Sequence, residues 1–329
     1  MLELNLDKAV EEIRKRKASK VAVQLPEGLK TRVLEIAEKL QETGVTVFTF
    51  VDPCYGACDL VDKEAKGVGA DLLIHFGHTR FLDKEEIETI YIPLNYKIQK
   101  GMLINLMDKL SKVVGEKKVA VCSTAQYLHL IQQFKQGLEK KGFRVEIGKG
   151  KGVERGQVLG CNYSSVKATE GKAEAIIFLG DGLFHPLGIS FISSKRVFTA
   201  NPLSGEVKEL KGERELFLKK RNAVIASAMQ AKSFGILLST KQGQLREKLA
   251  LELKEKLEKT GRKAFLLVGD LIRAEYILGI KVEALVSTAC PRIALDDASS
   301  YKVPVLNPAE VLIALGEKTF EQYSVDELK

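Results

Sequence analysis

The chain has 329 residues, of which 45% are hydrophobic and 29% are charged, and its formal net charge is +8. This length allows two or three domains, and this composition is ordinary for a globular protein with a sizeable core. The apolar runs are too short to cross a bilayer, and no arginine-rich tract with interleaved aromatic residues occurs. We therefore expect neither a membrane anchor nor direct binding to nucleic acid.

The N-terminal segment and the cysteines indicate the compartment. The segment MLELNLDKAVEEIRKRK has no apolar stretch and contains acidic residues, so it does not match a secretory signal, and we expect a cytoplasmic protein. Five cysteines in a chain of this length do not predict a disulfide framework. In a reducing compartment they favour metal ligation or catalysis, although a single cysteine can also be a small buried apolar residue.

Residues 1–100 contain four strand-like runs that are rich in β-branched residues and are separated by polar turns. An amphipathic helix follows the first run, because apolar residues recur there at three-four spacing. Gly44 is the expected stop of this helix. The predicted strands are Lys20–Leu25, Thr46–Val51, Leu72–Phe76 and Thr89–Ile92, and the predicted helix is Lys30–Thr43.

The same pattern recurs in residues 101–210. Its amphipathic helix again ends at a glycine, Gly142, directly before the second strand. The predicted strands are Lys118–Cys122, Arg144–Ile147, Ala175–Leu179 and Val197–Thr199, and the predicted helix is Tyr127–Lys141.

A third copy of the pattern lies in residues 211–329. Its last strand ends in VLNP, as the earlier ones end in IPLN and TANP, and Gly261 ends its helix. A long helix, Arg214–Lys232, is predicted to join the second and third copies. The predicted strands are Gly235–Ser239, Lys263–Val268, Ala284–Ser287 and Pro304–Leu306, and the predicted helix is Leu245–Thr260.

Strands that alternate with helices require parallel pairing through right-handed crossovers. Because the whole set recurs, we predict an α/β fold of three related small parallel-sheet domains with helices on the faces. The expected domains are residues 1–100, 101–210 and 211–329. One large doubly wound sheet is the alternative.

Three cysteines lie in loops at the expected carboxyl ends of strands, where ligands bind in open parallel sheets. Cys58 and Cys161 follow second strands, and Cys290 follows a third strand. Thiolates are the usual ligands of iron–sulfur clusters, and three of them would leave one iron open. Spacing alone does not decide between Cys58 and Cys54, whereas Cys122 lies in an apolar strand and is expected in the core.

Several local motifs are absent. A C-x3-C-x2-C loop that begins at Cys54 would need a cysteine where the chain has Val61, and no C-x2-C zinc motif occurs. The glycine-rich dinucleotide fingerprint, the phosphate-binding loop and the G-x-S-x-G elbow are also missing. These absences disfavour nicotinamide, nucleotide-triphosphatase and serine-hydrolase chemistry.

Other polar groups at the strand ends are weaker candidates for ligand binding. A glycine-rich turn allows close approach of the backbone to a ligand but is also an ordinary tight turn. A histidine, a residue before a helix or a surface arginine can equally cap a helix or remain in solvent. Phe184 is proposed to exclude water from the reactive part of a bound ligand. The candidates are His78, Gly180, Asp181, Gly182, Phe184, His185, Thr240, Gln242 and Arg292.

An ordered set of motifs resembles one known family, the diphthamide synthases, formally the 2-(3-amino-3-carboxypropyl)histidine synthases. The resemblance extends over nearly the whole chain and looks most like the archaeal form. Single motifs are weak, but the ordered set is specific. The motifs are QLPEGL (24–29), DPCYGACD (52–59), HFGH (75–78), LGCN (159–162), LGDGLFHP (179–186), GILLSTKQGQ (235–244) and ACPR (289–292).

The resemblance implies three domains in a pseudo-threefold arrangement, a homodimer, and a 4Fe–4S cluster bound by Cys58, Cys161 and Cys290. It also implies S-adenosylmethionine as cosubstrate and an electron donor. By a radical route the bond from sulfur to the γ-carbon is cleaved, and a 3-amino-3-carboxypropyl group is attached to a histidine of translation elongation factor 2. This is the first step of diphthamide biosynthesis. Cys54 departs from the family pattern and is either a bystander or a competing iron ligand.

Two other functions remain open at this point. Quinolinate synthase is similar in having three related domains and a three-cysteine cluster, but it condenses small metabolites. The chain could also be a non-catalytic iron–sulfur partner that transfers electrons to a catalytic subunit. Product analysis and modification of elongation factor 2 distinguish these functions.

Overall fold

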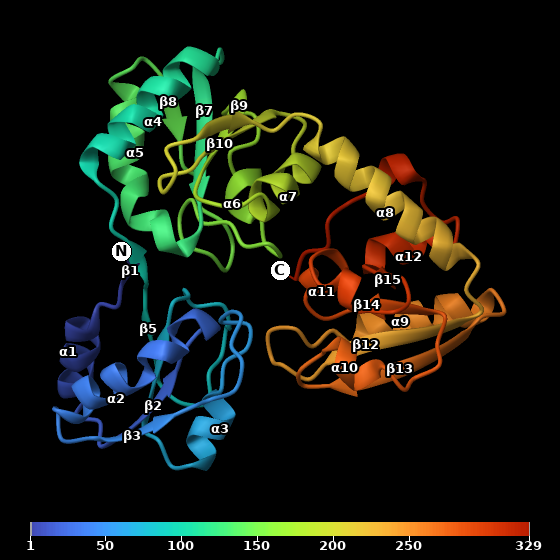
Figure 1. Cartoon of the computed structure of the whole chain (residues 1–329), viewed down its shortest axis with the longest axis horizontal. Coiled ribbons are helices and arrows are strands. Elements are labelled where there is room, and N and C mark those ends of the chain that lie inside the picture. Colours follow the sequence, from blue (N-terminus) through green and yellow to red (C-terminus); the bar gives the residue numbers. More distant parts are fainter. Residues whose placement is uncertain (1, 329) are drawn as a thin grey trace. The chain divides into compact units, whose positions relative to one another are not determined.

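The computed structural model describes residues 2–328 (Figure 1). By its internal contacts the chain divides into two compact units. The first comprises residues 2–158, 164–181 and 198–208, and the second comprises residues 159–163, 182–197 and 209–328. Within the described residues no helix is both long enough and apolar enough to span a bilayer.

The first sheet has the strand order β3-β2-β4-β5, and all its pairs are parallel. Helices α1 and α2 contribute Ala9, Ile13, Ile36 and Leu40 to one apolar core with β2, β4 and β5, so both pack on the same face of the sheet. Strand β1, which precedes this sheet in the sequence, pairs antiparallel with β6, which follows it. The elements are β1 (Leu2–Glu3), α1 (Leu6–Arg16), β2 (Lys20–Gln24), a 3₁₀ helix (Glu27–Arg32), α2 (Val33–Gln41), β3 (Thr46–Thr49), α3 (Asp62–Gly67), β4 (Leu72–Phe76), β5 (Thr89–Ile92) and β6 (Asn95–Tyr96).

The second sheet has the order β8-β7-β9-β10-β11. Two backbone bonds, Leu210 N to Val197 O and Asn201 N to Glu206 O, show that β11 runs antiparallel to β10. Helices α4 and α5 share one core with β7, β9 and β10. The elements are α4 (Lys100–Val113), β7 (Lys118–Ser123), a 3₁₀ helix (Ala125–Leu130), α5 (Ile131–Glu139), β8 (Arg144–Glu146), α6 (Ser164–Lys167), β9 (Ala175–Leu179), α7 (Phe184–Ile192), β10 (Arg196–Ala200) and β11 (Val207–Glu209).

The third sheet has the order β13-β12-β14-β15, with parallel pairs. Helices α8, α9 and α12 cover one face, and α11 packs in a second core on the other. The elements are α8 (Glu213–Met229), β12 (Ser233–Ser239), α9 (Glu247–Lys259), β13 (Lys263–Gly269), α10 (Ala274–Ile277), β14 (Ala284–Ser287), α11 (Arg292–Leu295), a 3₁₀ helix (Ala298–Ser300), β15 (Val305–Leu306), α12 (Pro308–Ala314) and a 3₁₀ helix (Phe320–Gln322).

All three sheets share one strand order: numbered along each repeat, their first four strands run 2-1-3-4. The predicted α/β class is therefore confirmed, and the alternative of one large sheet is wrong. The predicted domain boundaries and the pseudo-threefold arrangement stay predictions. The predicted helices Lys30–Thr43 and Tyr127–Lys141 are too long. In the structure the first turns of each are a 3₁₀ segment, and the α-helix begins only after it.

A buried ion pair fixes the third sheet. Arg221 on α8 donates through Nε and Nη2 to Glu310 on α12, both at 2.6 Å, and their side chains are 5% and 0% exposed. The same guanidinium donates to the carbonyls of Ala294, at 2.7 Å, and Val305, at 2.8 Å. One arginine thus connects α8, α11, α12 and β15, and α11 is the helix that follows Cys290.

Candidate functional site

The loop after β3 carries two cysteines with different surroundings. Cys54 is buried, whereas Cys58 is partly exposed. Gln24, the last residue of β2, holds this loop, because its Nε2 donates to Asp59 O at 2.6 Å and its Oε1 accepts from Val61 N at 3.3 Å. The loop therefore presents Cys58 outward and Cys54 inward.

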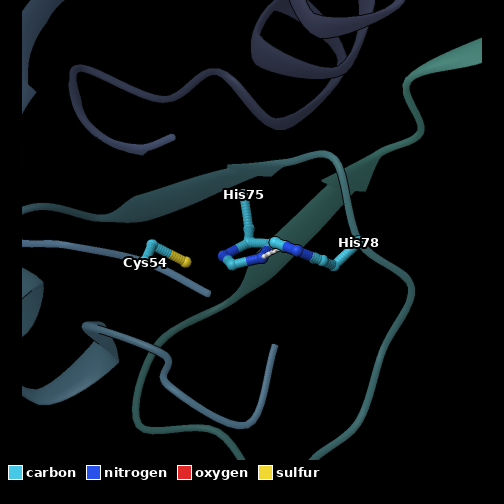
Figure 2. A group of neighbouring side chains, drawn as sticks. All are labelled: Cys54, His75 and His78. Carbon is cyan, nitrogen blue, oxygen red and sulfur yellow. Dashed lines mark hydrogen bonds between the residues drawn. The ribbon is translucent and has the colours of Figure 1, made fainter. Parts of the chain in front are cut away.

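Two histidines at the end of β4 lie beside Cys54 (Figure 2). His75 contacts Gln24 Oε1 through Nδ1, at 2.8 Å, and His78 Nδ1 through Nε2, at 2.9 Å. Burial, with a smaller contribution from His78, lowers the pKa of His75 well below its usual value. Burial also lowers the pKa of His78 to about 4. Both imidazoles are therefore neutral at physiological pH.

The second sheet places Gly180 and Asp181 directly after β9. The amide of Gly180 donates to Ala200 O at 3.0 Å, and a side chain at Gly180 would come within 2.9 Å of the Phe178 ring. Tyr127 Oη donates to Asp181 Oδ1 at 3.1 Å, and burial together with Asp181 raises the pKa of Tyr127. Asp181 is exposed and can accept further hydrogen bonds at this strand end.

Phe184 brings the loops of Cys161 and Cys290 together within the second unit. A side-chain carbon at Gly160, next to Cys161, would overlap the Phe184 ring, so the ring lies directly on the backbone of this loop. The guanidinium of Arg292, two residues after Cys290, lies 4.9 Å from the centroid of the same ring. Cys161 and Cys290 are both partly exposed.

The C-terminal segment also holds these two loops. Leu328 N donates to Cys161 O, and Glu327 Oε1 accepts from Tyr163 N, both at 2.9 Å. Asp326 accepts from Arg246 at 2.6 and 2.8 Å, and Arg246 Nε donates to Thr288 O at 2.7 Å. Sequence reasoning missed these residues, since a short acidic segment at the end of a chain carries no motif.

The remaining candidates have ordinary local partners. Thr240 Oγ1 donates to Asp270 Oδ1 at 3.3 Å, and Gln242 is exposed in the following turn. The predicted helix at Leu245 begins at Glu247, so this turn does not lead directly into it. The His185 ring packs edge-on against Phe184, and Gly182 has a φ of 72°, which favours glycine.

The five cysteines fall into two classes. Cys54 and Cys122 are buried, and burial raises the pKa of the Cys122 thiol, as expected for a core residue. Cys58, Cys161 and Cys290 are partly exposed on loops at strand ends. This donor set, three accessible thiols on otherwise unrelated loops, fits the three-cysteine ligation of an iron–sulfur cluster. Cys58 belongs to the first unit and the other two to the second, so their joint ligation stays a prediction.

The fold and the site together define a class of α/β protein. It has three sheets with the same strand order, and cysteine thiols lie in loops that follow the strands. Residues 25–324 match the model of a family described as "Putative diphthamide synthesis protein". The chain belongs to this family.

Similar proteins share nearly the full length of the chain. The 2-(3-amino-3-carboxypropyl)histidine synthase of Pyrococcus horikoshii is 39% identical, over 99% of this chain and 94% of that protein. The protein of that name from Methanocaldococcus jannaschii is 32% identical, over 94% of this chain and 88% of its own length. A crystal structure of Dph2 from Pyrococcus horikoshii with a 4Fe–4S cluster superposes with a TM-score of 0.91, at 38% identity, and covers 100% of this chain and 95% of that one.

Proposed function

We propose that the protein is a transferase that moves a 3-amino-3-carboxypropyl group from S-adenosylmethionine to a histidine of translation elongation factor 2, the first step of diphthamide biosynthesis. The observation that carries the proposal is the division of the cysteines. The three partly exposed thiols are Cys58, Cys161 and Cys290, the set that the family resemblance implies. Relatives named for this reaction and the cluster in the similar crystal structure support it.

These three cysteines would hold the 4Fe–4S cluster, with one iron left open. When bound, the cluster supplies the electron that cleaves the bond between sulfur and the γ-carbon of S-adenosylmethionine. Cys54 is the weaker candidate for the first ligand, because its thiol is buried beside His75 and His78. Spacing in the sequence does not decide between Cys54 and Cys58 as the cluster ligand, and the difference in burial favours Cys58.

The chain's own side chains would position the cosubstrate and exclude water. The Phe184 ring contacts both the Cys161 loop and Arg292, and in this position it would shield a bound fragment from water. Arg292 Nε donates to Asp296 at 2.5 Å, and its side chain is 58% exposed. A methionine carboxylate could replace Asp296 on this guanidinium, because an arginine fork binds carboxylates in a bidentate manner. Such positioning would decide which carbon–sulfur bond faces the open iron.

The homodimer, the electron donor and the cytoplasmic location are parts of the same proposal. The dimer has a candidate surface on β13, an edge strand of the third sheet, where Phe265 and Val268 are 49% and 62% exposed. An edge strand offers unpaired backbone groups to a second copy. We propose that a second copy of the chain adds its own β13 there.

The test is anaerobic purification of single cysteine variants. Cys58→Ala, Cys161→Ala and Cys290→Ala should each lose the cluster absorbance and the paramagnetic signal of the reduced cluster. Cys54→Ala and Cys122→Ala should keep both. With reductant and S-adenosylmethionine, the intact protein should release methylthioadenosine and add mass to elongation factor 2. Unmodified elongation factor 2 would favour an electron-transfer partner, and quinolinate from small precursors would favour a quinolinate synthase.

A further inference from the structure

Cys54, His75 and His78 form a compact group of metal-binding donors in the first unit, distinct from the three partly exposed cysteines. One donor atom from each residue lies within 4.8 Å of the other two. In Figure 2 the Cys54 sulfur points toward the His75 ring, and the His75 and His78 rings meet through their nitrogens. Sequence reasoning treated these residues separately, with Cys54 as a possible iron ligand and His78 as a cofactor contact.

The hydrogen bonds of Gln24 determine which nitrogen of His75 has a lone pair. Gln24 Nε2 must donate to the carbonyl of Asp59, so its Oε1 faces His75 Nδ1. An oxygen can only accept, and Nδ1 therefore carries the proton. His75 Nε2 is left unprotonated, and it points toward His78 Nδ1.

A ligand histidine in a metal site is commonly held in this way, with its second nitrogen donating to an oxygen of the protein. The Gln24 side-chain oxygen would hold the His75 ring in the orientation that a metal needs, by accepting from Nδ1. Burial keeps both imidazoles neutral, and neutral imidazole is the form that binds metal.

We propose that Cys54, His75 and His78 bind one Zn²⁺ ion. Thiolate sulfur and imidazole nitrogen are both common zinc ligands, and three protein ligands leave a fourth position for water. On binding, Cys54 loses its thiol proton to solvent, and the proton that His78 Nδ1 donates to His75 Nε2 moves to His78 Nε2 by a change of tautomer. The bond between His75 Nε2 and His78 Nδ1, now 2.9 Å, is replaced by two zinc–nitrogen bonds. Two nitrogens at about 2.0–2.1 Å from tetrahedral zinc lie roughly 3.3 Å apart, so these two nitrogens need only a small shift.

Bound zinc would connect the loop of Cys54 to the end of β4. The zinc ion would have one sulfur and two nitrogen ligands from the protein, whereas the cluster of the proposed function has only cysteine sulfurs as protein ligands. The two sites can therefore be lost independently of each other.

The test measures zinc and iron in the full-length, cluster-loaded protein after anaerobic incubation with Zn²⁺ and removal of excess metal. We expect about one zinc per chain, and X-ray absorption at the zinc edge should show one sulfur near about 2.3 Å and two nitrogens near about 2.0–2.1 Å. This edge does not detect iron. Cys54→Ser and His78→Gln should each bind zinc at least about tenfold more weakly.

Matched controls separate this site from others. Cys122→Ser and His129→Gln change the same residue types elsewhere and should keep the zinc. Cys58→Ala should lose the cluster and keep the zinc, so failure of the proposed function and failure of the zinc site give different results. Absence of zinc from the intact protein overturns the proposal, and so does zinc that persists unchanged in Cys54→Ser and His78→Gln.

Discussion

The guanidinium of Arg292 lies 4.9 Å from the ring centroid of Phe184. This contact joins the first residue of α11, just after Cys290, to the first residue of α7, whose ring rests on Gly160 beside Cys161. Because the Phe184 ring contacts residues near both Cys161 and Cys290, replacing it should change the surroundings of both thiols.

Replacing Phe184 should uncouple cleavage from transfer. Phe184→Ala removes the ring that shields the reactive fragment, so the yield of modified elongation factor 2 per methylthioadenosine should fall severalfold. Phe184→Leu keeps an apolar side chain and should lose less. The measurement is quantitative mass spectrometry of both products. An unchanged yield in Phe184→Ala removes the support for a shielding role.

The contact itself should have a measurable coupling energy. A double-mutant cycle with Phe184→Leu and Arg292→Gln, followed by chemical unfolding, should give about 0.5–1 kcal/mol, because the arginine is exposed. A coupling energy near zero would show that the two side chains are merely adjacent.

Breaking the contact between Arg246 and Asp326 should loosen the Cys290 loop. Asp326→Asn weakens two charged hydrogen bonds to the arginine that also holds Thr288 O. We expect a loss of about 1–3 kcal/mol in the free energy of unfolding and a lower cluster content after reconstitution. Glu321→Gln, in the same C-terminal region but exposed, is the control and should change neither quantity.

Removing one partner of the buried pair Arg221 and Glu310 should be strongly destabilising. Glu310→Gln leaves a buried guanidinium with less charge compensation, and we expect a loss of about 3–5 kcal/mol in urea unfolding. The exposed pair of Lys254 and Glu258 is the comparison, and Glu258→Gln should cost less than about 0.5 kcal/mol. Equal effects of the two substitutions would contradict the role given to burial.

A charge on β13 should dissociate the proposed dimer. Val268→Lys places a cation on the exposed edge strand, and sedimentation should then report a monomer. Leu251→Lys, on the exposed side of α9, is the matched control and should leave the mass unchanged. If Val268→Lys still sediments as a dimer, the interface lies on another surface.

Much of the fold could be predicted, because it depends on local patterns. The strand runs at Leu72–Phe76, Thr89–Ile92, Ala175–Leu179 and Ala284–Ser287 have the predicted bounds, since β-branched and apolar residues fill them between polar turns. The repeat also predicted separate sheets. Strand β11 was not predicted, because it is a short edge strand whose partner, β10, lies across a tight turn.

Less of the site could be predicted, because its contacts join residues far apart in the sequence. Arg221 lies in the middle of a charged helix, and nothing local distinguishes it from its exposed neighbours. His75 lies among the apolar residues of β4 and therefore looks like part of the core. Only tertiary packing shows that Gln24, on another strand, fixes its tautomer.

The buried pair of Arg221 and Glu310 also has a thermal consequence. The hydration of charged groups becomes less favourable as temperature rises, so the cost of removing these two charges from water shrinks on heating. The net contribution of the pair therefore grows in hot conditions, where apolar burial no longer gains strength. At high temperature, the ion pair therefore keeps α11, the helix after Cys290, in place better than a pair of apolar side chains at the same two positions would.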